Sequence, residues 1–264
     1  MLSSLIAWAS AFRDALVFLT QLVPSREDSI PNNFPATVFF FAPVGFVVGS
    51  LLTLAAWMTH LAATRTTGND LLAAFLAAWV WLALNIWITR GLHWDGLADL
   101  GDATGSMKHG EQFRLILKDS RLGTFGALQV LLVFIGQWLA IAGHLYESFG
   151  HLFLLMLAST WTRSSAIWLA SGANPHTDAG LGRLMCMSIS SPVRRAYMLL
   201  AVFMLILPAL AGICLWSQML ITGLLQYLLL RRLWHVAKRE GGLSGDFFGA
   251  CMEVSQLCFL LGTL

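Results

Sequence analysis

Long apolar runs separated by short polar connections make up most of this 264-residue chain. A helix needs about 20 apolar residues to cross the roughly 30 Å of bilayer hydrocarbon, and most of these runs approach that length. The pattern therefore predicts about seven transmembrane helices, of which the last two are the shortest. Their expected ranges are 36–63, 71–89, 125–143, 152–170, 196–216, 218–233 and 247–264.

The N-terminal segment differs from these runs. Between Leu5 and Val23 the apolar residues recur at helical spacing, but Arg13 and Asp14 interrupt them on a polar face. This pattern is typical of an amphipathic helix that lies in the membrane interface or is partly inserted. A polar connector follows up to residue 35. The expected fold class is thus an all-α, polytopic integral membrane helix bundle, with an amphipathic helix and connector in residues 1–35.

Composition agrees with a membrane protein. The chain is 57% hydrophobic and 11% charged, whereas soluble domains carry about 25% charged residues. A formal net charge of +2 gives no reason to expect a nucleic-acid partner. The four cysteines show no CxxC spacing, so neither a zinc site nor a disulfide framework is expected. No repeat or long linker divides the chain, and one domain covering residues 1–264 is predicted.

Lysine and arginine residues indicate how the bundle is oriented. The connections after the second, fourth and sixth predicted spans are rich in these residues, whereas those after the third and fifth contain none. Basic connections are expected on the cytoplasmic side of the membrane. The N-terminus, residues 90–126 and the start of the last span would then all face the cytoplasm.

Three aspartates lie close together in this otherwise acid-poor chain. Asp95, Asp99 and Asp102 are four and three residues apart, although only 14 of 264 residues are Asp or Glu. If the segment is helical, they lie one above another on a single face. Ionised carboxylates so close together repel one another and require a cation. Their hard oxygen atoms suit Mg²⁺ or Mn²⁺, ions that commonly bridge carboxylates and substrate phosphates.

The same segment contains cations that could hold a phosphate. Lys118 and Arg121 flank Asp119 and Ser120, and two glycines follow. A further charge, Arg163, falls inside the fourth predicted span, where it costs about 2.5–3.5 kcal/mol on insertion scales. Arg163 is therefore expected to have an acidic partner, either Glu253 or an aspartate of residues 95–102.

Two long motifs carry a resemblance to a known family. Residues 91–99 (GLHWDGLAD) and 118–126 (KDSRLGTFG) resemble the cobalamin synthase family, whose members are adenosylcobinamide-GDP ribazoletransferases. Shorter similarities at residues 18–24, 43–45 and 245–250 extend the resemblance over essentially the whole chain. One difference is that Asp102 is followed by Ala103, where family members often continue with Asp-Gly.

The resemblance implies a phosphoryl-group transfer at the cytoplasmic face of the bacterial inner membrane. A ribose hydroxyl of α-ribazole, or of its 5′-phosphate, would attack the cobinamide-side phosphorus of adenosylcobinamide-GDP and release GMP. Such a displacement needs charge neutralisation on the diphosphate and a base near the attacking hydroxyl. The expected Mg²⁺ ligands (Mn²⁺ as the alternative ion) are Asp95 and Asp99, completed by Asp119 or Asp246. The expected substrate-binding residues are Lys118, Ser120, Arg121, Arg90, Arg114 and His93, with Asp102 as the general base.

Other interpretations of these residues stay open at this stage. Lys118 and Arg121 are also explained as positive-inside residues, Asp246 as a helix N-cap, and His93 as a plain hydrogen-bonding residue. A CDP-alcohol phosphotransferase would use similar aspartates, but its Asp-Gly is followed three residues later by Ala-Arg, whereas here Asp99 follows Asp95-Gly96. A small transporter would spread polar residues over several helices near the midplane. Partners are the two substrates and the bilayer, and self-association or association with other cobalamin-assembly enzymes stays open.

Overall fold

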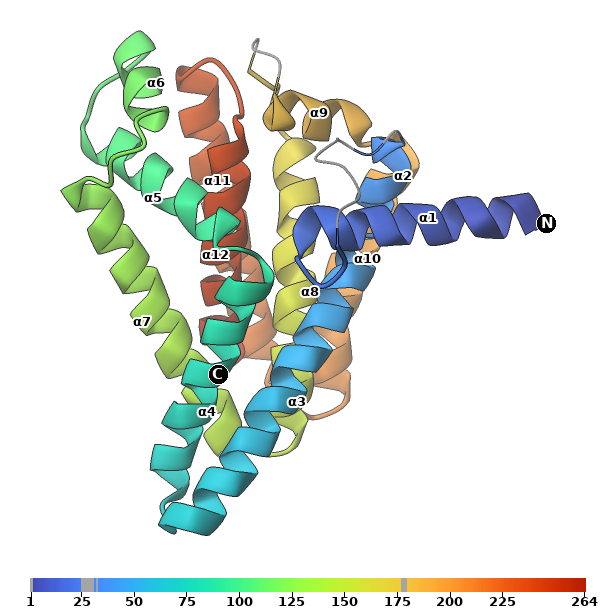
Figure 1. Ribbon diagram of the computed structural model, residues 1–264, viewed down its shortest axis with the longest axis vertical. Helices are drawn as coiled ribbons and strands as arrows, with labels where there is room; N and C mark the ends of the chain where they lie inside the picture. Colours follow the sequence, from blue (N-terminus) through green and yellow to red (C-terminus); the bar gives the residue numbers. More distant parts are fainter. Residues whose placement is uncertain (1, 25–30, 32, 177–179) are drawn as a thin grey trace.

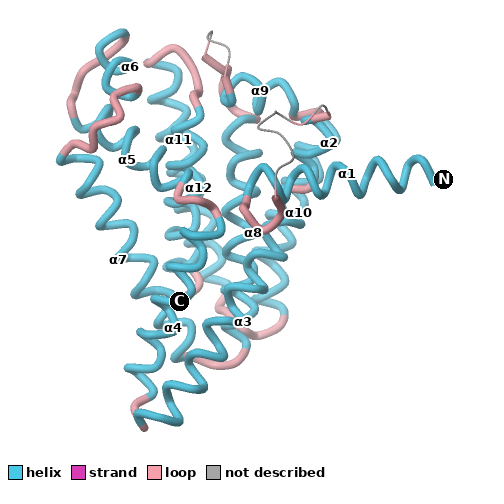
Figure 2. Tube along the Cα trace, viewed as in Figure 1, coloured by secondary structure: helices cyan, strands magenta, loops and turns pink. Residues whose placement is uncertain are grey.

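The computed structural model describes residues 2–24, 31, 33–176 and 180–264, which form twelve α-helices (Figure 1). Loops join these helices, and within the described residues there is no β-strand (Figure 2). The predicted all-α membrane bundle is confirmed. Five helices are long and apolar enough to cross a membrane: α3 (Phe41–Thr67), α4 (Asp70–Ile88), α7 (Thr124–Tyr146), α8 (Gly150–Ala170) and α10 (Ser191–Leu210).

The predicted number of seven spans is not confirmed. The sixth and seventh runs are helical, as α11 (Trp216–Arg239) and α12 (Gly245–Gly262), but neither is apolar enough to count as a span by composition. Helix α12 is less apolar than a typical span because it lies inside the bundle. There Glu253, Ser255 and Gln256 are buried against protein rather than lipid. The first predicted run is also divided, into α2 (Phe34–Phe39) and α3.

Helix α1 (Leu2–Leu19) lies across the bundle rather than along it, and its N-terminal end projects away from the other helices (Figure 1). Its C-terminal end is fixed to α4, because the backbone N–H of Gln21 donates to Ile88 O at 2.8 Å and its side-chain Nε2 donates to Trp87 O at 2.6 Å. This arrangement is the one expected for an interfacial amphipathic helix. The connector predicted up to residue 35 lies partly outside the described residues.

The connections predicted to be basic gather at one end of the bundle. Three short helices lie there, namely α5 (Leu92–Gly105), α6 (Glu111–Leu117) and α9 (Leu181–Ser188), next to the link between α11 and α12 (Figure 1). The turn between α3 and α4 lies at the opposite end (Figure 1). Segments that are far apart in the sequence therefore meet on one face.

The buried charge on α8 has Glu253 as an acidic neighbour, but no ion pair between described residues joins the two, and Nε and Nη2 of Arg163 have no hydrogen-bond partner among them. Arg163 and Glu253 of α12 are each 1% exposed, and the Glu253 carboxylate attracts the Arg163 guanidinium. Gln137 of α7 also donates from Nε2 to Glu253 Oε2 at 3.1 Å. This polar cluster joins α7, α8 and α12 inside the bundle, directly below the end that carries the short helices.

Candidate active site

The site is built where α5 crosses α12. The two helices touch at Gly96 and Gly249, and a Cβ added at Gly96 would lie 2.9 Å from Asp246 Cα. A Cβ added at Gly249 would lie 2.8 Å from His93 O. Only glycine allows backbones to approach so closely. The crossing therefore brings the aspartates of α5 next to Asp246, which is about 150 residues away in the sequence.

The carboxylates at this crossing are electrostatically coupled. Burial raises the pKa of Asp99 to about 6, and the negative charges of Asp95, Asp246 and Asp102 add to this effect. Burial also raises the pKa of Asp246, and Asp95 contributes to the increase, while hydrogen bonds from Ser244 and from the Asp246 backbone oppose it. Repulsion of this kind disfavours full ionisation unless a cation is present.

Asp246 does not cap α12. Ser244 occupies the N-cap position, and its hydroxyl donates to Asp246 Oδ2 at 3.0 Å. Asp246 lies in the first turn, where the helix dipole favours a negative charge. The alternative in which Asp246 serves as the N-cap is therefore wrong, and its carboxylate faces the site.

Two adjoining cavities meet at Asp246. The first, of about 120 Å³, is lined by His93, Asp95 and Asp246 together with apolar residues. The second, of about 170 Å³, is lined by Asp246 and by four basic residues, Arg114, Lys118, His176 and Arg183. An acidic compartment therefore opens next to a basic one, and one carboxylate borders both.

Paired backbone segments form the wall of the basic cavity. His176 N donates to Leu243 O at 3.1 Å, and Leu243 N donates to Asn174 O at 3.1 Å. These bonds form a short parallel bridge between Pro175 and Leu243. The link between α8 and α9 is thus held against the link between α11 and α12, which fixes His176 beside Asp246.

Asp102 has a structural role that its sequence position does not reveal. Its Oδ2 accepts the backbone N–H of Gly123 at 2.7 Å, and its Oδ1 accepts that of Gly126 at 2.8 Å. These are N–H groups at the beginning of α7, which have no partner within the helix. The carboxylate thereby ties the second sequence motif to the first. Each oxygen keeps a second lone pair, so the predicted role as general base stays a prediction.

Several predicted site residues lie apart from this pair of cavities. Arg121, whose side chain is 88% exposed, donates to Asp119 through Nε at 3.0 Å and Nη2 at 2.7 Å. These hydrogen bonds from Arg121 lower the pKa of Asp119 to about 2. Ser120 is exposed on the same connection, and Arg90 is exposed just before α5. In this conformation Asp119 and Arg121 form an ion pair with each other. Either side chain could contact substrate or metal only if this ion pair separated.

His93 is buried beneath the aspartates. It is 6% exposed, it borders the acidic cavity, and its Nδ1 lies 3.6 Å from Glu253 Oε1. This distance is longer than a hydrogen bond but short enough for electrostatic attraction. His93 therefore connects the Arg163–Glu253 cluster to the floor of the site.

The donor set fits a metal ion that the substrate helps to bind. Among the described residues no three His, Cys, Asp or Glu side chains are close enough to hold an ion by themselves. Magnesium, however, is usually bound through one or two carboxylates, several waters and substrate phosphates. The mutual repulsion at Asp99 and the adjoining basic cavity suit such an ion.

Sequence reasoning missed two residues of the site, His176 and Arg183. Both lie on the connection after the fourth predicted span, whose lysine and arginine content indicates only that it faces the cytoplasm. Their position beside Asp246 depends on the backbone pairing at Leu243. No local motif around either residue signals this contact.

Comparison with known proteins gives a consistent result. Residues 11–264 match the family model described as Cobalamin-5-phosphate synthase. Several relatives carry the name adenosylcobinamide-GDP ribazoletransferase. One from Nitratidesulfovibrio vulgaris (strain DP4) is 37% identical over 249 residues, which cover 92% of this chain and 93% of the relative. Another from Brevibacillus brevis is 30% identical over 260 residues and 96% of each chain, and one from Klebsiella pneumoniae (strain 342) is 30% identical over 96% of this chain and 99% of the relative. No solved structure matches the chain.

Proposed function

Since the chain belongs to the Cobalamin-5-phosphate synthase family, we propose that it is a membrane-bound adenosylcobinamide-GDP ribazoletransferase. In this reaction a ribose hydroxyl of α-ribazole, or of its 5′-phosphate, attacks the phosphorus on the cobinamide side of the diphosphate. A new P–O bond forms, the P–O bond to the GMP phosphate breaks, and the hydroxyl proton passes to a base. The product is a cobalamin or its 5′-phosphate.

The observation that carries this proposal is the shared border at Asp246. A diphosphate lying across that border would have its reacting phosphorus near Asp95 and Asp246, to which Asp99 is electrostatically coupled, and its leaving phosphate near Lys118 and Arg114. Charge transferred to the leaving GMP would thus develop among cations. Electrostatic stabilisation of this kind is usually the largest contribution to phosphoryl transfer.

Asp95, Asp99 and Asp246 are the residues that would hold Mg²⁺, and Asp119 would join them only if it left Arg121. When bound, the ion would neutralise phosphate oxygens and stabilise the developing negative charge. Lys118 and Arg114 would orient the diphosphate, and Arg183 and His176 would extend that basic surface. Asp102 is the proposed proton acceptor, positioned by its bonds to Gly123 and Gly126.

The setting of the reaction would be the cytoplasmic face of the bacterial inner membrane. The positive-inside rule supports this orientation, because the site lies at the end of the bundle that carries the basic connections. Water-soluble nucleotide substrates would then reach the cavities directly.

The test is GMP release by the detergent-purified protein supplied with adenosylcobinamide-GDP. Release should require Mg²⁺ and either α-ribazole or its 5′-phosphate. Asp95→Asn and Lys118→Ala should each lower turnover by about 100-fold or more, because each removes a charge aimed at the reacting diphosphate. Lys108→Ala is the matched control, since Lys108 is exposed on the link between α5 and α6 and borders neither cavity.

Two results would contradict the proposal. One is the absence of GMP release from folded protein in the presence of both substrates and metal. The other is competitive inhibition by CMP but not by GMP, which would favour a CDP-alcohol phosphotransferase. If Lys108→Ala and Lys118→Ala lost the same amount of turnover, Lys118 would have no specific role at the site.

A further inference from the structure

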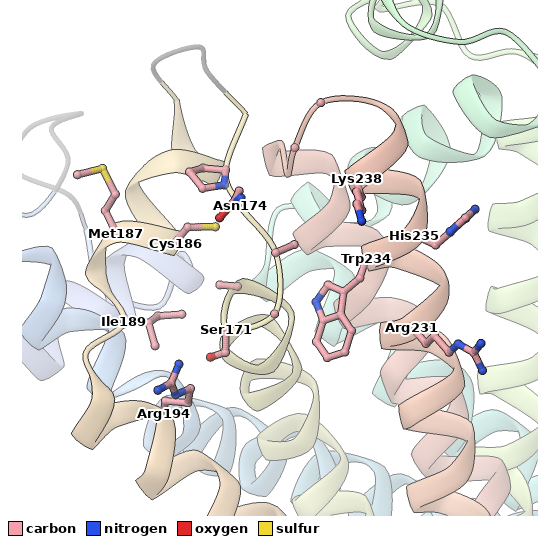
Figure 3. Close-up of a pocket in the computed structure, with 16 residues that line it drawn as sticks. Ser171, Asn174, Cys186, Met187, Ile189, Arg194, Arg231, Trp234, His235 and Lys238 are labelled. Carbon is pink, nitrogen blue, oxygen red and sulfur yellow. The ribbon is translucent and has the colours of Figure 1, made fainter.

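A larger cavity, of about 880 Å³, lies at the same end of the bundle but outside the proposed active site (Figure 3). It is formed by the C-terminal end of α8, by α9, and by the facing ends of α10 and α11. Trp234 of α11 points toward α8 and the hollow, Arg194 of α10 lies across from it, and Arg231 and His235 extend from the other side of α11 (Figure 3). Lys238 of α11 also borders the cavity. The paired backbone at Pro175 and Leu243 separates this cavity from the carboxylates.

The polar cavity continues into an apolar groove of about 720 Å³ between α8, α10 and α11. Four residues, Ser171, Gly172, Arg194 and Trp234, border both spaces. Exposed apolar side chains such as Met198, Leu199 and Tyr227 form the groove's outer edge. The groove therefore opens on the surface of the bundle that faces lipid.

The length of the groove matches one leaflet of a bilayer. It extends along α10 from Arg194 to Leu205 and along α11 from Trp234 to Gly223. Eleven residues at 1.5 Å per residue give about 16 Å along each helix. Half of the roughly 30 Å hydrocarbon thickness is about 15 Å. An acyl chain entering beside Arg194 would reach the midplane near Gly223.

Basic side chains without an ion-pair partner in the described part of the chain favour an anionic ligand in the polar cavity. None of the ion pairs between described residues uses Arg194, Arg231 or Lys238.

We propose that this composite space binds one anionic phospholipid of the bilayer, with its phosphate in the cavity that Arg194 and Lys238 border and an acyl chain between α10 and α11. Basic pockets between transmembrane helices on the cytoplasmic side recognise anionic headgroups. A free nucleotide would satisfy the cations but would leave the apolar groove empty. Lipid is therefore the occupant that matches both halves, and this site is independent of the proposed transferase activity.

The experiment compares lipid binding by the whole protein in detergent. Native mass spectrometry would measure the affinity for phosphatidylglycerol and for phosphatidylcholine, which has the same chains but no net charge. The double variant Arg194→Gln/Lys238→Gln should bind phosphatidylglycerol about 30-fold more weakly, at about fivefold per cation. Lys108→Gln/Arg232→Gln removes the same charge from exposed positions that border neither space and should bind like wild type.

A second variant tests the groove without changing charge. A Cβ at Gly223 would meet only Leu205 Cδ1 at 3.5 Å, an ordinary contact, so Gly223→Leu should fold and fill the deep end of the groove. It should weaken phosphatidylglycerol and phosphatidylcholine binding to the same degree. The proposal is overturned if phosphatidylglycerol shows no preference over phosphatidylcholine, if the control pair loses as much affinity as the cavity pair, or if millimolar GMP displaces the lipid.

Discussion

Substituting alanine for Gly96 would test whether the crossing of α5 and α12 sets the geometry of the active site. The new Cβ would lie 2.9 Å from Asp246 Cα and 3.0 Å from Asp246 O, whereas ordinary contact begins near 3.4 Å. Both contacts are to backbone, which cannot rotate away as a side chain can. The two helices would therefore have to separate by about 0.5 Å, the difference between 3.4 Å and 2.9 Å.

The expected change in the free energy of unfolding follows from two opposing effects. Overpacking costs about 1–3 kcal/mol, whereas replacing glycine by alanine inside a helix gains about 1 kcal/mol. Gly96→Ala should thus lower the free energy of unfolding by up to about 2 kcal/mol. A misplacement of about 1 Å can reduce a rate by about 100-fold, so a shift half that size should reduce GMP release by about tenfold.

Gly223→Ala is the matched control, because it makes the same change on a helix where the nearest atom is a side-chain carbon at 3.5 Å. It should leave turnover unchanged and raise stability by up to about 1 kcal/mol. Thermal unfolding in detergent and GMP release would be measured for both variants. Wild-type turnover and stability in Gly96→Ala would refute the conclusion that this close approach positions Asp246 against Asp95.

Three further predictions concern charged side chains. Asp102→Asn replaces one of two acceptors by a donor that faces a backbone N–H, so it should lower stability by about 1–3 kcal/mol as well as turnover; unchanged thermal unfolding would argue against its structural role. The raised pKa of Asp99, about 6, means that the folded state loses stability as pH rises from 3.8 through 6. Asp99→Asn should therefore raise Tm at pH 7.5 but not at pH 4. In the wild type, Mg²⁺ should raise Tm more at pH 7.5 than at pH 5, where protons compete with the ion for the carboxylates. Equal increases in Tm at the two pH values would exclude the carboxylates as Mg²⁺ ligands. Glu253→Gln removes the negative charge that offsets the buried Arg163 guanidinium and should lower the free energy of unfolding by about 1–3 kcal/mol, measured in an unfolding titration. The double variant Arg163→Met/Glu253→Leu, which removes both charges, should lower it less.

The apolar runs by themselves determined most of the secondary structure. Backbone polar groups in lipid must all be hydrogen-bonded, so only helices and closed β-barrels cross a bilayer. Apolar runs of about 20 residues have the length of a helix and are too long for a barrel strand. The spacing of apolar residues in the first segment likewise predicted a helix, which the structure shows as α1. The acid-poor composition also made Asp95, Asp99 and Asp102 stand out, and helical geometry alone placed them on one face.

Only the tertiary structure decided which of these residues work together. Asp246 joins Asp95 because two glycines let α5 and α12 touch, and Arg183 and His176 join it because Leu243 pairs with the link after α8. Such contacts between distant segments leave no mark in the local pattern of either one. The number of spans was not predicted correctly from hydropathy for a related reason. Hydropathy measures how well a residue suits lipid, whereas the polar residues of α12 are buried against protein. Asp102 shows the same limit, because a carboxylate that fixes the start of α7 and one that accepts a proton look identical in sequence.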